Sequence, residues 1–166
     1  MVSLKNKIRN FKEMLQKIED HKNEGKKVVF TNGCYDLIHV GHVRFLEQCK
    51  RLGDILVVAL NSDRSVRSIK GLPRPIIPQD ERAEIVAALE YVDYITIFDQ
   101  DDPLELITQL KPDVLVKGGD WTLPTIVGRE VVESYGGKVY SIPLIPGAST
   151  SKIITFIANS YKNKGD

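Results

Sequence analysis

The stretch Val28-Val29-Phe30-Thr31-Asn32-Gly33-Cys34-Tyr35-Asp36-Leu37-Ile38-His39-Val40-Gly41-His42 decides the fold. Its opening residues are β-branched or aromatic and predict a strand, whereas the apolar spacing after His42 has the period of a helix. Two glycines lie in the segment that joins them. A strand that runs through a short glycine-containing loop into a helix is typical of the first unit of a parallel α/β sheet.

Short β-branched runs recur along the rest of the chain, and helical patterns separate them. Because the predicted strands are almost continuous apolar runs, we expect a parallel sheet that helices cover on both faces. The expected strands are 28–31, 55–60, 94–98, 113–117 and 138–142. The expected helices are 42–52, 79–92, 103–110, 125–135, a short one before Lys70, and a last one that begins at Ser149 or Thr150. The sequence therefore predicts a doubly wound, five-stranded, Rossmann-like α/β fold of strand order 3-2-1-4-5.

We also expect an N-terminal helix in front of this sheet. Its apolar residues recur at steps of four and three along one helix face: Leu4, Ile8, Phe11, Leu15 and Ile18. This stripe either packs on its own domain or contributes to a dimer contact, and we expect a homodimer. The predicted organisation is a helical extension at 1–25, one α/β domain at 26–162 and a tail at 163–166.

The composition excludes several classes of protein. The 166 residues are 42% hydrophobic and 27% charged, as in ordinary globular domains. The net charge is +1, and acidic residues interleave with basic ones near the N-terminus, so we expect no nucleic-acid partner. Because no apolar run suits a membrane helix or a signal peptide, we expect no membrane association and a cytoplasmic location. Cys34 and Cys49 lack CxxC spacing, so neither a disulfide nor a zinc ribbon is expected.

Ligands of a doubly wound sheet bind beyond the carboxyl ends of the strands, where the strand order reverses. In the predicted order this point lies between the first and fourth strands, so the loops after Thr31 and Lys117 are the first candidates. His39 and His42 flank Gly41 at the start of the helix that follows the first loop. A helix start attracts phosphate through its free N–H groups, and imidazoles beside it can donate further hydrogen bonds and become cationic.

Two other interpretations of the histidine pair stay open at the level of the residues. One is a metal site shared with Cys34 or His21, although no third ligand has a convincing spacing. The other is a structural pair that caps the helix, which an isolated HxGH pattern would equally allow. The wider context of the motif favours the phosphate site.

The stretch TNGCYDLIHVGH at 31–42 resembles the GxFDxxHxGH signature of the nucleotidyltransferase superfamily, with Tyr35 where phenylalanine is usual. The similarity covers about residues 26–158 in the order of the family. Its further motifs are Asn61-Ser62-Asp63, Lys70-Gly71, Arg74-Pro75, Glu81-Arg82, Val116-Lys117-Gly118-Gly119-Asp120-Trp121 and Gly147-Ala148-Ser149-Thr150-Ser151. Together these motifs are most similar to the adenylyltransferase part of the ADP-heptose synthases.

This resemblance implies transfer of AMP from ATP to D-glycero-β-D-manno-heptose 1-phosphate, which gives ADP-heptose and pyrophosphate. It also implies Mg²⁺, held mainly by the phosphates, and a separate heptose kinase that supplies the sugar 1-phosphate, because many relatives carry a fused sugar kinase. One alternative is a cytidylyltransferase that acts on glycerol 3-phosphate or another polyol or sugar phosphate. A further alternative is a nucleotide-binding subunit without catalytic activity.

The resemblance also assigns roles to residues. The residues implied to be catalytic are His39, His42 and Lys70. The residues implied to bind the nucleotide are Thr31, Asn32, Gly33, Cys34, Tyr35, Gly41, Lys117, Gly118, Gly119, Ser149, Thr150 and Ser151. The residues implied to bind the acceptor substrate are Asp36, Arg74, Asp120 and Trp121, and Asp36 is also a possible ligand of the metal.

Most of these residues have an ordinary structural interpretation as well. Asp36 can cap a turn, and Lys70 can be a solvated surface charge. Trp121 can belong to the core, and one of the three hydroxyl residues at 149–151 can cap the last helix. Related cytidylyltransferases carry an arginine just before that last motif. Here the segment is 144–146, Leu-Ile-Pro, so we expect Lys70 and the metal to supply more of the compensating charge.

Overall fold

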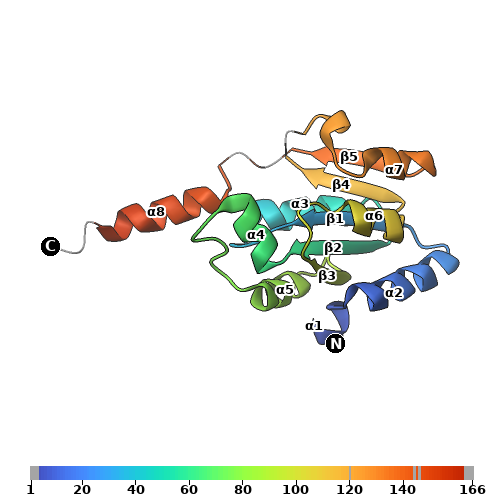
Figure 1. Ribbon diagram of the computed structural model, residues 1–166, viewed down its shortest axis with the longest axis horizontal. Coiled ribbons are helices and arrows are strands. Elements are labelled where there is room, and N and C mark those ends of the chain that lie inside the picture. The colour runs from blue at the N-terminus through green and yellow to red at the C-terminus, as the bar shows by residue number, and fades with distance from the viewer. Residues whose placement is uncertain (1–3, 120, 144, 146, 163–166) are drawn as a thin grey trace.

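The computed structural model describes residues 4–119, 121–143, 145 and 147–162. Five parallel strands form one sheet in the order β3-β2-β1-β4-β5, which confirms the predicted fold class and strand order (Figure 1). The strands are β1 (Val28–Gly33), β2 (Ile55–Asn61), β3 (Tyr94–Phe98), β4 (Val114–Gly118) and β5 (Lys138–Ile142). All seven residues of β2 are buried, as expected for a strand that helices cover on both faces.

Helices pack on both faces of the sheet and divide the hydrophobic core into two clusters. The helices are α1 (Leu4–Lys7), α2 (Phe11–Asn23), α3 (Val40–Lys50), α4 (Asp63–Lys70), α5 (Gln79–Ala87), α6 (Leu104–Leu110), α7 (Arg129–Ser134) and α8 (Thr150–Lys162), with a 3-10 turn, η1, at Leu123–Thr125. Side chains of α3 and α5 fill one cluster, and side chains of α2, α6 and α7 fill the other. The packed core therefore holds the strand ends, and the loops that follow them, in fixed positions.

The N-terminal stripe packs on its own domain. Ile18 of the stripe is buried in the core cluster that α2, α6 and α7 fill, and Phe11 and Leu15 pack against that cluster. The stripe is not one continuous helix, because Asn10 accepts a hydrogen bond from the Glu13 N–H and starts α2 anew. For α2, the structure therefore favours packing on its own domain over a dimer contact, while the division of the chain at residue 25 stays a prediction.

Two helices end or begin away from their predicted positions. Helix α5 ends at Ala87 rather than near Val92, because Lys7 Nζ donates to the carbonyl oxygens of Leu89 and Val92 at 3.4 and 2.7 Å and stabilises a turn there. Helix α7 begins only at Arg129, because the preceding Gly128 adopts a left-handed φ of 86° that interrupts helical geometry. Both differences come from contacts or backbone geometry that apolar periodicity does not encode.

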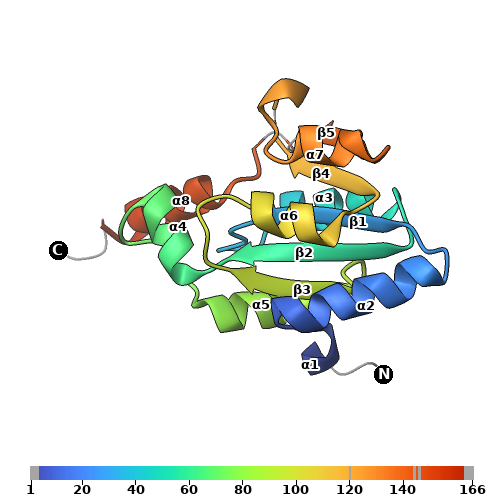
Figure 2. The same cartoon turned by 45° about the vertical axis from the view of Figure 1, so that its right-hand side comes forward.

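Helix α8 leaves the body of the protein and projects into solvent (Figures 1 and 2). No side chain of its described part, Thr150 to Tyr161, is buried. Phe156 is 72% exposed and Tyr161 is 69% exposed. Over the described ranges, no helix combines the length and apolar character that crossing a bilayer requires.

Candidate active site

The loops after β1 and β4 meet at the carboxyl edge of the sheet, as the strand order predicts. Strands β1 and β4 are neighbours, and Lys117 Nζ at the end of β4 donates to Asn32 Oδ1 at the end of β1 at 3.3 Å. Burial lowers the pKa of the Lys117 ammonium, and the nearby charge of Lys70 lowers it further. A partly desolvated cation therefore lies where the two strands end.

The loop after β1 folds back on its own strand. Tyr35 has a left-handed φ of 48°, and its buried ring lies over Gly33, where an added Cβ would come within 2.9 Å of a ring carbon. The same ring lies 5.1 Å from the ring of His42, centroid to centroid. Gly33 therefore allows Tyr35 to form the wall behind His42, which gives this glycine a packing role.

His39 and His42 stack on each other at the start of α3. Their ring centroids are 3.9 Å apart with 24° between the planes, and both residues are half-buried. His42 Nδ1 accepts a hydrogen bond from the His39 backbone N–H at 3.4 Å. Because an N–H group can only donate, the proton of a neutral His42 ring must sit on Nε2. The pair therefore presents an N–H donor beside the free N–H groups of a helix start.

Burial favours the neutral form of both rings. It lowers the pKa of His42 to about 4, and the neighbouring His39 contributes to this shift. Burial also lowers the pKa of His39. His39 Nδ1 is buried without a hydrogen-bond partner among the described residues. A phosphate oxygen at this place would satisfy that nitrogen and would favour the charged form of either ring.

His21, one partner that the metal-site interpretation considers, lies away from the histidine pair. His21 lies on α2 and shares a hydrogen bond of 2.8 Å with the hydroxyl of Tyr94, the first residue of β3. That contact places His21 at the amino end of the sheet, away from the loop after β1. In the parts of the chain that the structure describes, no three His, Cys, Asp or Glu side chains gather in a way that could hold an ion.

The start of α8 lies beside the start of α3. Thr150 Oγ1 donates to the Leu37 carbonyl oxygen at 3.1 Å. A Cβ at Gly41 would come within 2.9 Å of the His39 ring and 3.3 Å of Ala148 Cβ, so the two segments are in close contact there. Ser149 Oγ accepts from the Lys152 N–H at 3.2 Å and is thus the N-cap. Two helix starts therefore converge near the histidine pair.

Four cationic side chains act on Cys34, in the loop after β1. Burial raises the pKa of the Cys34 thiol, whereas the positive charges of four side chains oppose that rise: Lys70, Arg82, Arg74 and Lys117. Two of the four form ion pairs, Arg74 with Asp36 and Arg82 with Asp63. Among the described residues, Lys70 and Lys117 have no carboxylate partner, so the crevice keeps an excess of positive charge that suits an anionic ligand.

Asp36 and Arg74 form a buried pair that fixes a neighbouring loop. The Asp36 side chain has no exposed surface, and its carboxylate accepts from Arg74 Nε at 2.5 Å and from the N–H groups of Ile76 and Ile77 at 2.8 and 2.9 Å. With three donors already bound, the carboxylate anchors the segment that follows Lys70. Contacts of Asp36 and Arg74 with the acceptor substrate stay predictions.

The loop after β4 carries an exposed aromatic ring. Trp121 is 48% exposed, so it is not a core residue, and Lys117 Nζ lies 5.8 Å from its ring centroid. A Cβ at Gly118 would approach the Phe45 ring to 3.0 Å, so Gly118 is needed for close packing against α3. Asp120, the other predicted sugar contact here, lies outside the described residues.

The roles of two polar residues escaped the sequence analysis. Arg82 is fully buried on α5, and Asn61 is buried at the end of β2, where its amide donates to Ser65 Oγ at 3.0 Å. Both residues appear in the motifs that resemble the family, but the sequence analysis assigns them no role. The available signal was the place of Arg82 among the inward-facing positions of α5, next to Ala83 and one turn before Val86.

Two helix starts and an excess of cations lie at the switch point of this doubly wound α/β sheet, an arrangement that suits an anionic ligand such as a polyphosphate. The chain belongs to the cytidylyltransferase-like family, whose model matches residues 30–158. It is 54% identical to the bifunctional protein HldE of Syntrophotalea carbinolica and 55% identical to that of Geobacter metallireducens. These alignments cover 94% and 93% of this chain but 32% of each relative, so the chain spans about a third of the length of the curated relatives it matches.

Solved structures share the fold of this chain. The fold is similar to the lipopolysaccharide core biosynthesis protein of Thermoplasma volcanium GSS1, with a TM-score of 0.59 and 26% identity over 73% of this chain and 98% of that one. It is also similar to a pantoate-beta-alanine ligase of Francisella tularensis, with a TM-score of 0.58 over 82% of this chain and 66% of that one. At 14% identity, this second likeness concerns the fold alone.

Proposed function

We propose that the protein is an adenylyltransferase that joins AMP from ATP to D-glycero-β-D-manno-heptose 1-phosphate, with release of pyrophosphate. The observation that carries the proposal is the stacked pair of His39 and His42 at one helix start, in contact with a second helix start. Lys70 and Lys117, which have no carboxylate partner among the described residues, add positive charge around Cys34 in the adjoining loop. The high identity to the HldE proteins supports the choice of nucleotide and sugar.

The reaction that fits this site is a single in-line displacement at phosphorus. A phosphate oxygen of the sugar 1-phosphate attacks the α-phosphorus of ATP and forms the new P–O bond, while the bond from that phosphorus to the bridging α,β-oxygen breaks and pyrophosphate leaves. No proton has to be abstracted, because the attacking phosphate is already ionised at neutral pH. Catalysis then depends on positioning and on charge stabilisation, which are the main contributions of proteins to phosphoryl-type transfers.

The side chains of the crevice divide this work between them. His42 donates its Nε2–H to an oxygen of the α-phosphate, and His39 offers the second imidazole at the same helix start. Lys70 is the exposed last residue of α4, and it supplies a point charge to the departing phosphates. Ser149, Thr150 and Ser151 bring the second helix start to the other side of the triphosphate.

Magnesium enters this proposal as part of the substrate, the magnesium complex of ATP. The one carboxylate that we expected near the metal, Asp36, is buried with three donors already bound, so it does not fit the role of a ligand. We infer that phosphate oxygens and water hold the ion. The sugar 1-phosphate has to come from a kinase reaction, and we place both steps in the cytoplasm, without a nucleic-acid or membrane partner.

A substrate screen tests the proposed function. Pyrophosphate release is measured with ATP or CTP, each combined with heptose 1-phosphate or glycerol 3-phosphate. We expect turnover with ATP and heptose 1-phosphate. Turnover confined to CTP with glycerol 3-phosphate would replace the proposal by the cytidylyltransferase alternative, and ATP binding without turnover on any acceptor would favour a catalytically silent subunit.

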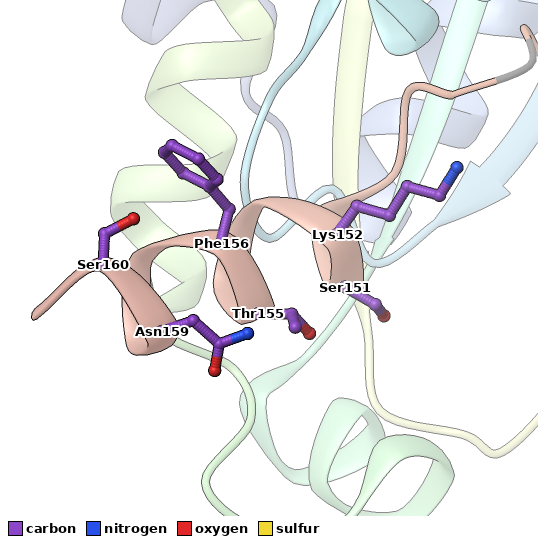
Figure 3. A pocket seen from close by; sticks show the side chains of 6 residues that line it. All are labelled: Ser151, Lys152, Thr155, Phe156, Asn159 and Ser160. Carbon is purple, nitrogen blue, oxygen red and sulfur yellow. The ribbon is translucent and has the colours of Figure 1, made fainter. Parts of the chain in front are cut away.

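We also propose that the protein is a homodimer, with α8 at the contact. The support is the exposure of Phe156 and Ile157, at 72% and 48%, on a helix whose own domain leaves it uncovered. Phe156 is one of the residues that line a pocket on this helix, and Figure 3 shows that the lining side chains, from Ser151 to Ser160, all come from α8. We expect light scattering to give a dimeric mass for the native chain and a monomeric mass for Phe156→Ser, with Thr108→Ala, an exposed exchange on α6, as the unaffected control. A monomeric native chain would contradict this proposal.

A further inference from the structure

Arg82 of α5 is the largest side chain that the structure buries completely. Removing a guanidinium from water is costly unless each of its N–H groups finds an acceptor, and an apolar side chain of similar size would fill the same space without that cost. A buried arginine at this position therefore calls for an explanation beyond filling the core. Its hydrogen bonds provide one.

The guanidinium joins segments that are distant in the sequence. Nη1 donates to the Cys34 carbonyl oxygen at 2.5 Å, and Nη2 donates to the Asn61 carbonyl oxygen at 2.9 Å. Nε donates to the Ile77 carbonyl oxygen at 3.0 Å, and Nη2 also contacts Asp63 Oδ1 at 2.8 Å. Three of the four acceptors are thus backbone carbonyls, so Arg82 fixes the course of the chain at the ends of β1 and β2 and before α5.

These carbonyls belong to the segments that carry the site. Cys34 directly precedes Tyr35, whose left-handed backbone places its ring 5.1 Å from that of His42. Ile77 ends the segment that follows Lys70, and its N–H donates to Asp36 at 2.9 Å. The loop after β1 and the segment after Lys70 are therefore tied together twice, through the Asp36 carboxylate and through the Arg82 guanidinium.

We propose that Arg82 is a positioning residue for nucleotidyl transfer, which sets the place of the His39–His42 pair relative to the Lys70 segment through the carbonyls of Cys34 and Ile77. This inference rests on the proposed function. A small displacement of groups that contact the transition state lowers the rate far more than it lowers substrate binding. The role of Arg82 should therefore be visible in kcat and in the surroundings of the histidines.

The test compares Arg82→Lys with Arg67→Lys, a matched exchange at an exposed arginine of α4. Lysine keeps the charge, but its single ammonium group cannot reach all four acceptors of the planar guanidinium. The chain has three histidines, so ring NMR signals of His39 and His42 report on the site while His21 serves as an internal reference. We expect the first two signals to shift in Arg82→Lys, and kcat to fall about 10- to 100-fold with KM for ATP changed less than about threefold. Arg67→Lys should match the native protein in both.

A purely structural role gives a different result. It would lower the melting temperature of Arg82→Lys but leave the His39 and His42 signals and the kcat of the folded protein unchanged, which would overturn the proposal. If Arg82→Lys does not fold, Asp63→Asn decides, because it loosens the same guanidinium, and unchanged signals in that variant also overturn the proposal. The NMR result does not depend on turnover, so it separates a failure of this inference from a failure of the proposed adenylyltransferase activity.

Discussion

The two helix starts at the candidate site are built in opposite ways. Helix α3 begins at the histidine pair and buries Gly41, Phe45, Leu46 and Cys49 in its own domain. In the described part of α8, by contrast, no side chain is buried. There, Thr150 Oγ1 links the helix to the loop after β1 through a hydrogen bond to the Leu37 carbonyl oxygen. The start of α3 is thus fixed by buried side chains, whereas the start of α8 is held by few contacts among the described residues.

This difference suggests a division of labour. A start that is fixed before the ligand arrives can stabilise the transition state, because it needs no reorganisation during the reaction. A start that is held by few contacts can adjust to the triphosphate and contribute mainly to binding. Variants on the α3 side should therefore act on kcat, and variants on the α8 side should act on KM.

The largest effect should follow from removing an imidazole on the α3 side. We expect His39→Ala and His42→Ala to lower kcat about 100-fold or more with the fold retained, because each loses a donor at the reacting phosphorus. Steady-state pyrophosphate release measures the effect, and circular dichroism verifies the fold. His21→Ala, at the amino end of the sheet, is the control that should keep its kcat. Native rates in both site variants would remove the basis of the proposed function.

A smaller effect should follow on the α8 side. Thr150→Val keeps the shape of the side chain but removes the hydrogen bond to the Leu37 carbonyl. We expect KM for ATP to rise about three- to tenfold while kcat changes less than about threefold, since about 1 kcal/mol of uniform binding is lost. Thr155→Val, an exposed exchange on the same helix, is the matched control. A large fall in kcat for Thr150→Val would show that the two helix starts are not functionally distinct.

The smallest effect concerns the dependence of stability on pH. The pKa of His42 is about 4 in the folded protein, below the ordinary value of 6.5, because its ring is buried. The unfolded chain therefore binds a proton at higher pH than the folded one, and the free energy of unfolding should decrease as the pH falls from 6.5 to 4. We expect this decrease to be about 1 kcal/mol smaller in His42→Gln, allowing for the part of the ring open to solvent. Denaturant melts at several pH values measure it, and equal slopes in both proteins would contradict the shift.

Much of the fold could be predicted because the strands are apolar runs and the first loop has a distinctive pattern. The crevice between β1 and β4 followed from strand order alone, and the hydrogen bond between Lys117 and Asn32 now spans it. The boundaries of α5 could not be predicted, since its end depends on Lys7, which is distant in the sequence. Periodicity reports where apolar residues gather, but not which distant side chain stabilises a helix end.

The candidate site was harder to predict than the fold. The motifs predicted the histidine pair and the two helix starts as parts of one site, and in the structure they lie together. It could not reveal that the Asp36 carboxylate is already bound by three donors, or that Arg82 is buried, because a charged residue in a sequence looks the same whether it meets solvent, a ligand or a backbone carbonyl. Only three-dimensional contacts distinguish these environments.

The bridge between Ile8 and Ile95 has a consequence for solubility. β3 lies at the border of the sheet, where unpaired N–H and C=O groups offer a template for a foreign strand. Ile8 pairs with Ile95 there, and the N–H of Arg9 donates to the Ile95 carbonyl oxygen at 2.9 Å. The few residues between α1 and α2 thus cover part of the exposed edge of β3. A chain trimmed to begin at α2 would leave this edge open to pairing with a second chain, and we expect it to aggregate.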